Sequence, residues 1–232
     1  MITLEHIGKR FGEREILKDV SFSMENGEFA ILFGPSGVGK TLLLSIIAGL
    51  EEPSSGRVLI NGCDMTRVPP DQRPVTLIFQ GHALFPHLTV FENIAFSLRA
   101  RRVSRNRVRE RVAELLALTG LESYAQVKPD ALSSGQCQRV AFARALAADA
   151  DVVLFDEPLS SLDYGLKAGL MSELKRLHRA LKFTALYVTH DREEALTLGE
   201  RVFLLEKGYI TRAGSPHALL PTPTATACMS RN

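Results

Sequence analysis

The chain has 232 residues, of which 45% are hydrophobic and 23% are charged, and its formal net charge is only +2. This composition is ordinary for a globular protein, so it excludes a disordered chain, a collagen-like repeat and a disulfide-rich scaffold, and it offers no strongly basic field for nucleic acid. No apolar run reaches the roughly 18–20 residues of a membrane-spanning helix, and residues 1–12 lack the apolar stretch of a signal peptide. We therefore expect neither an integral membrane protein nor a secreted one, and a partner of a membrane protein stays open. The three widely spaced cysteines, Cys63, Cys137 and Cys228, fit a reduced, cytosolic compartment.

The predicted elements begin with strands at residues 1–6 and 21–24, followed by an apolar strand at 29–33. A continuous apolar run between turn residues is typical of a strand buried on both faces of a parallel sheet. Further strands are expected, in chain order, at 57–60, 75–79, 152–155, 185–189 and 202–205. Helical patterns at 42–50, 104–116 and 165–181 lie between them.

Strands that alternate with helices indicate an α/β fold with a mostly parallel sheet. The stretch at about 82–146 contains no strong strand and is expected to be a helical insertion. We expect a single domain over residues 1–220. Residues 221–232 are polar and rich in proline and threonine, so we expect them to form a loose tail.

The segment between the strand at 29–33 and the following helix reads GPSGVGKT and matches G-x-x-x-x-G-K-[ST] in full. Glycines let successive backbone N–H groups turn toward phosphate oxygens, and the helix N-terminus adds its dipole. In this pattern the lysine reaches the β- and γ-phosphates and the final hydroxyl binds Mg²⁺. The predicted nucleotide-binding residues are Gly34, Pro35, Ser36, Gly37, Val38, Gly39, Lys40 and Thr41.

Two acids, Asp156 and Glu157, follow directly after the strand at 152–155. Acids at the carboxyl end of a buried strand lie at the functional edge of an α/β sheet. We expect Asp156 to hold Mg²⁺ through water, and Glu157 to orient or deprotonate the attacking water. Taken alone, the two could be helix-capping acids of a solvated loop, but a phosphate loop in the same chain favours the catalytic interpretation.

Residues 132–136 read LSSGQ, with QRVA and ARA following at 138–141 and 143–145. This segment resembles the LSGGQ signature of ATP-binding cassette (ABC) proteins. The phosphate loop, Gln80, the signature, the strand acids, SSLD at 160–163 and His190 also stand in the order of that family, over residues 1 to about 220. The resemblance implies a P-loop NTPase core with a mostly parallel sheet, an N-terminal antiparallel β region and a helical subdomain that carries the signature.

Within one chain, the resemblance implies roles for three further residues. Phe11 would stack on the adenine of ATP. Gln80 would sense Mg²⁺ and water and couple to a membrane partner. His190 would contact the γ-phosphate. The implied catalytic set is Glu157, His190 and Gln80, and the implied metal set is Thr41, Gln80 and Asp156.

Between chains, the resemblance implies that ATP joins two copies into a homodimer. Ser133, Gly135 and Gln136 would touch the γ-phosphate of an ATP held by the other copy, and Asp163 would lie at the dimer seam. A helix N-terminus facing the γ-phosphate from the far side would add its dipole to the site. Hydrolysis would then let the two copies part.

Three residues depart from the family pattern. Ser134 stands where the signature usually has glycine, and Cys137 replaces a usually polar residue. Leu42 replaces a second hydroxyl residue near the α-phosphate, so a hydrogen bond with a net value of roughly 0.5–1.5 kcal/mol is lost there. The residues expected to do the chemistry are all retained, so we predict an active ATPase.

The segment at 80–94, QGHALFPHLTVFENI, and THDREEA at 189–195 resemble cassettes of bacterial solute importers for polyamines, ferric iron, sulfate, molybdate or thiamine. This group implies an integral membrane permease that contacts the cassette between Ala83 and Phe96, a separate solute-binding protein, and a location at the cytoplasmic face of the inner membrane. Many of these relatives carry a C-terminal regulatory domain, which we expect to be absent here.

Two alternatives stay open. One is a cassette of an exporter or of a lipid-handling complex. The other is a nucleic-acid- or ribosome-associated ATPase, because residues 99–111 hold seven arginines. Glu110 and Glu114 interleave with that run and stacking aromatics are lacking, so we expect a solvated helix face, or one near anionic lipid, and no nucleic-acid partner.

Overall fold

The computed structural model describes residues 1–81 and 83–221. Its N-terminal part is a four-stranded antiparallel sheet in the order β2-β1-β4-β5. The strands are β1 (Ile2–Phe11), β2 (Arg14–Met24), β4 (Ser55–Ile60) and β5 (Cys63–Asp64). β1 and β2 are longer than predicted, because they pair along almost their whole length, which stabilises even their polar ends.

The second sheet has six strands in the order β10-β9-β3-β8-β7-β6. β3 (Phe29–Phe33), β6 (Val75–Ile78), β7 (Val152–Asp156), β8 (Thr184–Thr189) and β9 (Arg201–Glu206) pair in parallel. β10 (Tyr209–Gly214) adds an antiparallel edge. The sequence did not predict β10, because it is largely exposed and lacks a run of buried apolar residues. The predicted α/β class with an antiparallel N-terminal region is confirmed.

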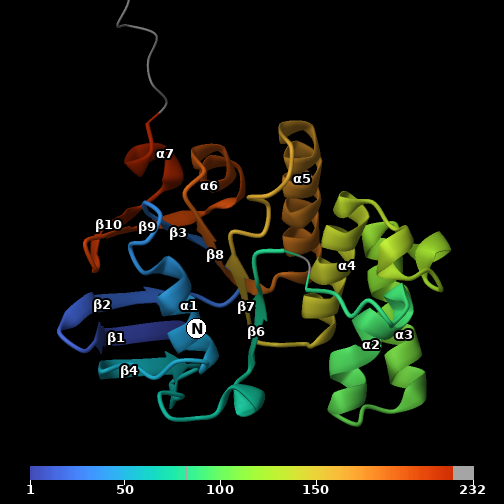
Figure 1. Ribbon diagram of the computed structural model, residues 1–232, viewed down its shortest axis with the longest axis horizontal. Helices are drawn as coiled ribbons and strands as arrows, with labels where there is room; N and C mark the ends of the chain where they lie inside the picture. The colour runs from blue at the N-terminus through green and yellow to red at the C-terminus, as the bar shows by residue number, and fades with distance from the viewer. Residues whose placement is uncertain (82, 222–232) are drawn as a thin grey trace, which may run out of the picture.

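The helices fall into two sets: one set connects the strands, and the other forms a separate group beside the sheet. α1 (Lys40–Ala48), α5 (Tyr164–Leu181), α6 (Arg192–Leu198) and α7 (Pro216–Leu219) follow strands. α2 (Val90–Ala100), α3 (Arg105–Thr119) and α4 (Ser134–Ala147) lie in the stretch predicted as a helical insertion. Figure 1 shows α2, α3 and α4 on one side of β6 and β7, with α1 and the antiparallel sheet on the other side.

Two hydrophobic clusters cover the two faces of the six-stranded sheet. Along β3, Phe29 and Ile31 face one cluster with α4 and α5, while Ala30 and Leu32 face the other with α1 and the antiparallel sheet. Because successive side chains of a strand point to opposite faces, burial on both sides produces the continuous apolar runs seen in the sequence. The sheet is thereby fixed as a rigid support for the loops at its edge.

Several predicted boundaries shift. α1 begins at Lys40 rather than at residue 42, because the left-handed Gly39 (φ 109°) is its N-cap. Ser104 precedes α3 as predicted, but its side chain makes no capping hydrogen bond. The predicted tail lies, apart from Pro221, outside the described residues. Within the described ranges, none of the helices combines the length and apolar character needed to cross a bilayer.

Candidate functional site: a phosphate-binding cleft

The candidate site lies where β3, β7 and β8 end. Parallel pairing places Phe33 beside Thr189 and Asp156 beside Val188, so the segments that follow these strands leave the same edge of the sheet. The phosphate loop follows β3, Glu157 follows β7 and His190 follows β8. Ligands of open α/β sheets bind at this carboxyl edge.

Glycines give the phosphate loop its shape. Gly37 and Gly39 have φ values of 78° and 109°, which residues other than glycine rarely adopt. A Cβ at Gly34 would lie 2.4 Å from the carbonyl oxygen of Leu205, so the loop can approach β9 only because glycine stands there. The first helical hydrogen bond of α1 runs from Leu43 N–H to Gly39, which leaves the preceding N–H groups available to an anion.

Lys40 is almost fully buried within this loop. Its Nζ donates to the carbonyl oxygens of Gly34 (2.9 Å) and Pro35 (3.0 Å), and it lies 3.3 Å from Glu157 Oε1. The ammonium group is therefore held inside the curve of the loop by two backbone acceptors. A positive charge fixed in a ring of N–H donors is complementary to a polyphosphate.

Thr41 and Asp156 form a pair of oxygen donors beside Lys40. The Thr41 hydroxyl donates to Asp156 Oδ1 at 3.0 Å. Burial raises the pKa of Asp156, the nearby Glu157 acts in the same direction, and the bond from Thr41 and the charge of Lys40 oppose this. A buried carboxylate next to a hydroxyl fits Mg²⁺, which takes oxygen ligands and is usually completed by water and substrate phosphates.

Glu157 occupies the centre of the site. Its Oε1 faces Lys40, and its Oε2 lies 3.0 Å from Nδ1 of His190. Its backbone has a left-handed φ of 44°, and its N–H donates to the carbonyl of Val188. Such a backbone costs of order 1–3 kcal/mol in a residue other than glycine, so the surrounding contacts hold this carboxylate in a conformation it would not adopt alone.

Gln80 reaches the site through a residue to which the sequence assigned no role. Its Nε2 donates to Ser160 Oγ at 3.2 Å, and Ser160 Oγ donates to the carbonyl oxygen of Glu157 at 2.9 Å. Ser160 therefore links the segment after β6 to the backbone of Glu157. The only sequence signal was its place in the segment SSLD at 160–163.

The cleft formed by these residues has a volume of about 710 Å³ and is lined by Ile16, Ser36, Gly37, Gly39, Lys40, Thr41, Leu42, Ser45, Gln80, Asp156 and Glu157. Leu42 also packs on the core cluster of α1, which explains an apolar residue at this position. Phe11 is not among the lining residues. It lies half-exposed at the end of β1, with Lys9 Nζ 4.9 Å from its ring centroid.

The signature residues lie at the start of α4, away from this cleft. Ser133 is the N-cap and forms a capping box with Gln136, and both side chains are engaged in it. A Cβ at Gly135 would lie 2.7 Å from Leu166 Cδ1, so glycine permits close packing of α4 on α5. Asp163 caps α5 by accepting from Leu166 N–H. None of these residues is among those that line the cleft, and Figure 1 shows α4 and α1 on opposite sides of β6 and β7.

The other two departures from the expected pattern are accommodated by the structure. Ser134 is exposed, so its Cβ meets no crowding. Cys137 is buried, its Sγ contacts the carbonyl of Pro129 at 3.6 Å, and burial raises the pKa of its thiol. Both side chains are therefore compatible with the fold around the signature.

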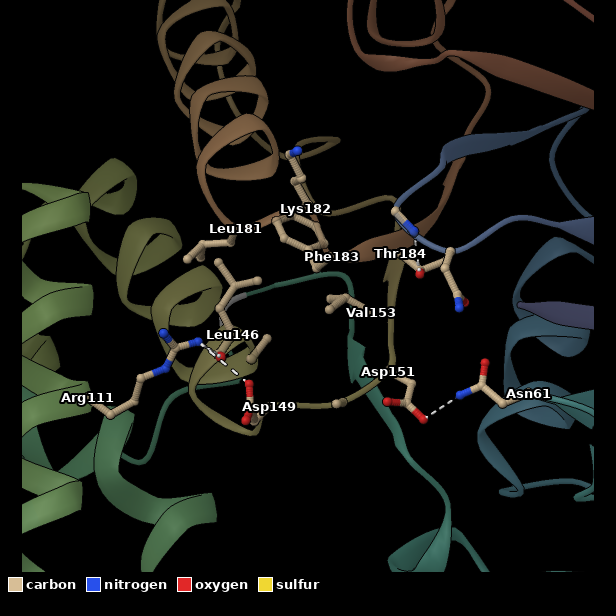
Figure 2. Close-up of a pocket in the computed structure, with 14 residues that line it drawn as sticks. Asn61, Arg111, Leu146, Asp149, Asp151, Val153, Leu181, Lys182, Phe183 and Thr184 are labelled. Carbon is tan, nitrogen blue, oxygen red and sulfur yellow. Dashed lines mark hydrogen bonds and ion pairs between the residues drawn. The ribbon is translucent and has the colours of Figure 1, made fainter.

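A second cavity lies at the amino ends of β7 and β8, away from the phosphate loop (Figure 2). Its polar side chains largely bind groups of the chain itself. Asn61 donates to Asp151 at 2.9 Å, and Arg111 donates to the carbonyl of Leu146 and lies 3.9 Å from Asp149. This cavity is a junction between the antiparallel sheet, the helical group and β7 rather than part of the site.

The family described as ABC transporter matches residues 17–160, which include the phosphate loop, Gln80, the signature and both strand acids. The chain belongs to the ABC transporter family. The fold and family predictions are therefore confirmed, and the order of ABC motifs is retained along this chain. His190 and Asp163 lie outside the matched range.

Similar proteins include two that are named spermidine/putrescine import ATP-binding protein PotA. The one from Pasteurella multocida is 47% identical over 96% of this chain, and the one from Thermotoga maritima is 48% identical over 96%. The chain spans 60% of the length of each of these relatives.

Two solved ABC structures share the fold. One is the dimeric ATP-binding cassette MJ0796 in a post-hydrolysis state with ADP and Pi, which is 34% identical with a TM-score of 0.77, covering 93% of this chain and 99% of that one. The other is cbiO1 from Clostridium perfringens, which is 26% identical with a TM-score of 0.86, covering 94% of this chain and 89% of that one.

Proposed function

We propose that this chain hydrolyses ATP as the nucleotide-binding subunit of an ABC importer. The observation that carries the proposal is the position of Glu157, whose carboxylate is held between Lys40 and His190 at the mouth of the phosphate loop. A carboxylate placed beside the γ-phosphate position is the residue type needed to orient or deprotonate an attacking water.

The chemistry divides among the residues of the cleft. Lys40 and the N–H groups of the loop bind the β- and γ-phosphates, and Thr41 and Asp156 would hold Mg²⁺. A magnesium ion bound there would offset the negative charge that develops on the phosphoryl oxygens. Glu157 accepts the proton of water or orients it, and His190 holds the second oxygen of that carboxylate.

A second copy would complete the site. The signature residues of α4 lie apart from the cleft of their own chain, and Ser133 is exposed. MJ0796 is described as a dimeric cassette with ADP and Pi. We infer that two copies of this chain close on ATP, each offering its phosphate loop to the other's signature.

A membrane partner would dock between Ala83 and Phe96. Asn93 is buried and binds the carbonyl oxygens of Phe85, Leu88 and Thr89, so it fixes the loop before α2. The rings of Phe85 and Phe96 lie 4.4 Å apart, and Phe96 is 46% exposed. An aromatic surface shared by this loop and α2 suits a short helix of a permease.

The solute would be selected outside this chain, by the permease and a solute-binding protein. The PotA relatives carry the words spermidine/putrescine import in their names. These polyamines are therefore the first solutes to test, in membranes that contain the complete transporter. This chain would lie at the cytoplasmic face of such a membrane.

Replacement of Glu157 by glutamine tests the hydrolytic assignment. Glu157→Gln keeps the shape but removes the base, so we expect ATP to bind and steady-state hydrolysis to fall roughly 10²- to 10⁴-fold. Glu122→Gln, at an exposed residue that does not line the cleft, is the matched control and should keep the parent rate. Parent-rate hydrolysis by Glu157→Gln would refute the assignment.

A further inference from the structure

His190 has little packing of its own to fix its position. Its side chain is 51% exposed, yet its Nδ1 lies 3.0 Å from Glu157. A half-exposed side chain keeps much of its rotamer freedom, so restraint of the backbone beside it narrows the directions that it can take. The residues next to it, Thr189 and Asp191, supply that restraint.

The Thr189 hydroxyl bridges the two sides of His190. Thr189 is 2% exposed, and its Oγ1 donates to Glu194 Oε2 at 2.7 Å and accepts from the N–H of Asp191 at 2.9 Å. Glu194 is also 2% exposed, and the same oxygen accepts from Tyr187 at 2.9 Å. The carboxylate therefore orients the hydroxyl, and the hydroxyl holds the peptide after His190.

Lys167 extends this network to α5. Its Nζ lies 3.4 Å from Glu194 Oε1 and 3.3 Å from Asp191 Oδ2. Burial acts to lower the pKa of Lys167, but Glu194 and Asp191 together outweigh it, and the pKa is raised. Lys167 lies one turn after Asp163, the residue expected at the dimer seam, so the start of α5 and the loop of His190 share one ion-paired cluster.

We propose that Glu194 is a positioning residue for His190, acting through the Thr189 hydroxyl and tied by Lys167 to the start of α5. The inference rests on the proposed function. Burial of a carboxylate carries a desolvation cost, and apolar groups of similar volume often replace buried ion pairs without loss of stability. In this proposal, the buried Glu194 carboxylate is retained because it fixes the direction of the His190 imidazole.

The test compares Thr189→Val with Thr189→Ser. Valine keeps the volume and removes the hydroxyl, whereas serine keeps the hydroxyl. We expect the kcat of Thr189→Val to fall roughly 10- to 100-fold, the scale of a 1 Å misplacement of a reacting group, with KM for ATP changed less than about threefold because the phosphate loop is intact. Thr189→Ser should retain most of the rate.

The matched control is Thr184→Val at the other end of β8. Thr184 is 3% exposed, and its hydroxyl accepts from the N–H of Gly27 at 3.0 Å. Thr184→Val should lose about as much stability as Thr189→Val and keep the parent kcat. Equal kcat loss in both valine variants, or none in Thr189→Val, would overturn the proposal.

A second readout needs no hydrolysis. The ring signals of His190 in the NMR spectrum, assigned by their loss in His190→Ala, should move in nucleotide-free Thr189→Val and stay in Thr189→Ser. If the parent chain fails to hydrolyse ATP, the proposed function is wrong, and these signals alone decide the positioning role. Should Thr189→Val not fold, Lys167→Met replaces it, and unmoved ring signals would overturn the proposal.

Discussion

The N-termini of α1 and α4 are both expected to face phosphate, and they are built differently. α1 starts at a glycine whose left-handed backbone leaves the first N–H groups without a side-chain cap. α4 starts at Ser133, which forms a reciprocal capping box with Gln136. The first terminus offers bare backbone donors, and the second already satisfies two of its groups within the chain.

This difference assigns different tasks to the two helices. At α1, no side chain caps the first N–H groups, so a phosphate that binds there displaces no capping bond. At α4, a phosphate must compete with the capping box. We therefore expect α1 to supply most of the affinity for ATP. We expect α4 to contact the ATP of the other copy only when the two copies have closed.

Of the changes that test this difference between α1 and α4, loss of Lys40 should have the largest effect, and the effect should be on ATP affinity. Lys40→Ala removes a buried charge-assisted interaction that contributes roughly 1.5–3 kcal/mol, so the Kd for ATP should rise roughly 10- to 150-fold. Titration with a fluorescent ATP analogue measures this. An unchanged Kd would mean that α1 is not the main binding terminus.

The capping box of α4 offers a second test with its own control. Ser133→Ala should lower the free energy of unfolding by about 1 kcal/mol, the usual value of an N-cap. Thr89→Ala removes the equivalent capping box of α2, which lies away from the cleft lining, and should cost about the same. Denaturant unfolding compares the two.

ATP-driven association separates these two caps. Of the two variants, only Ser133→Ala should weaken it, because Ser133, unlike Thr89, is expected to meet the γ-phosphate of the other copy. Equal weakening by Thr89→Ala would show that the effect comes from helix stability rather than from contact with ATP.

The carboxylate beside α1 gives the smallest predicted change. Because burial raises the pKa of Asp156, the folded state binds its proton more tightly than the unfolded state, and the resulting stability is lost as pH rises through the folded pKa. Asp156→Asn should therefore raise Tm at pH 7, by roughly 2–4 °C for each kcal/mol gained in the free energy of unfolding. The gain should shrink as the pH falls toward 4, and Mg²⁺-dependent hydrolysis should be lost. A lower Tm at pH 7 would contradict this sign.

Much of this site was predictable because it follows from local pattern and strand order. The phosphate loop needs glycines between a buried strand and a helix, and parallel strands bring Asp156 and Thr41 to one edge. The capping box at Ser133 was not predicted, although serine followed three residues later by glutamine is its sequence signature.

Other features depend on contacts between segments far apart in the chain. The sequence gives no sign that Ser160 would link Gln80 to Glu157, or that the Glu157 backbone would be left-handed. Glu194 looks like an ordinary helix residue, and only the packing of α5 and α6 on β8 buries it against Thr189. Phe11 was placed by resemblance alone, and its ring lies outside the cleft lining.

The mass of the Glu157→Gln chain in solution, measured by light scattering with and without Mg²⁺ and ATP, tests the account most directly. We expect a monomer without nucleotide and a dimer with ATP, whereas the double variant Glu157→Gln/Ser133→Glu should stay monomeric, because a carboxylate would meet the γ-phosphate of the other copy. A Glu157→Gln chain that binds ATP and remains monomeric, or a double variant that dimerises equally well, would contradict the sharing of one ATP between two copies.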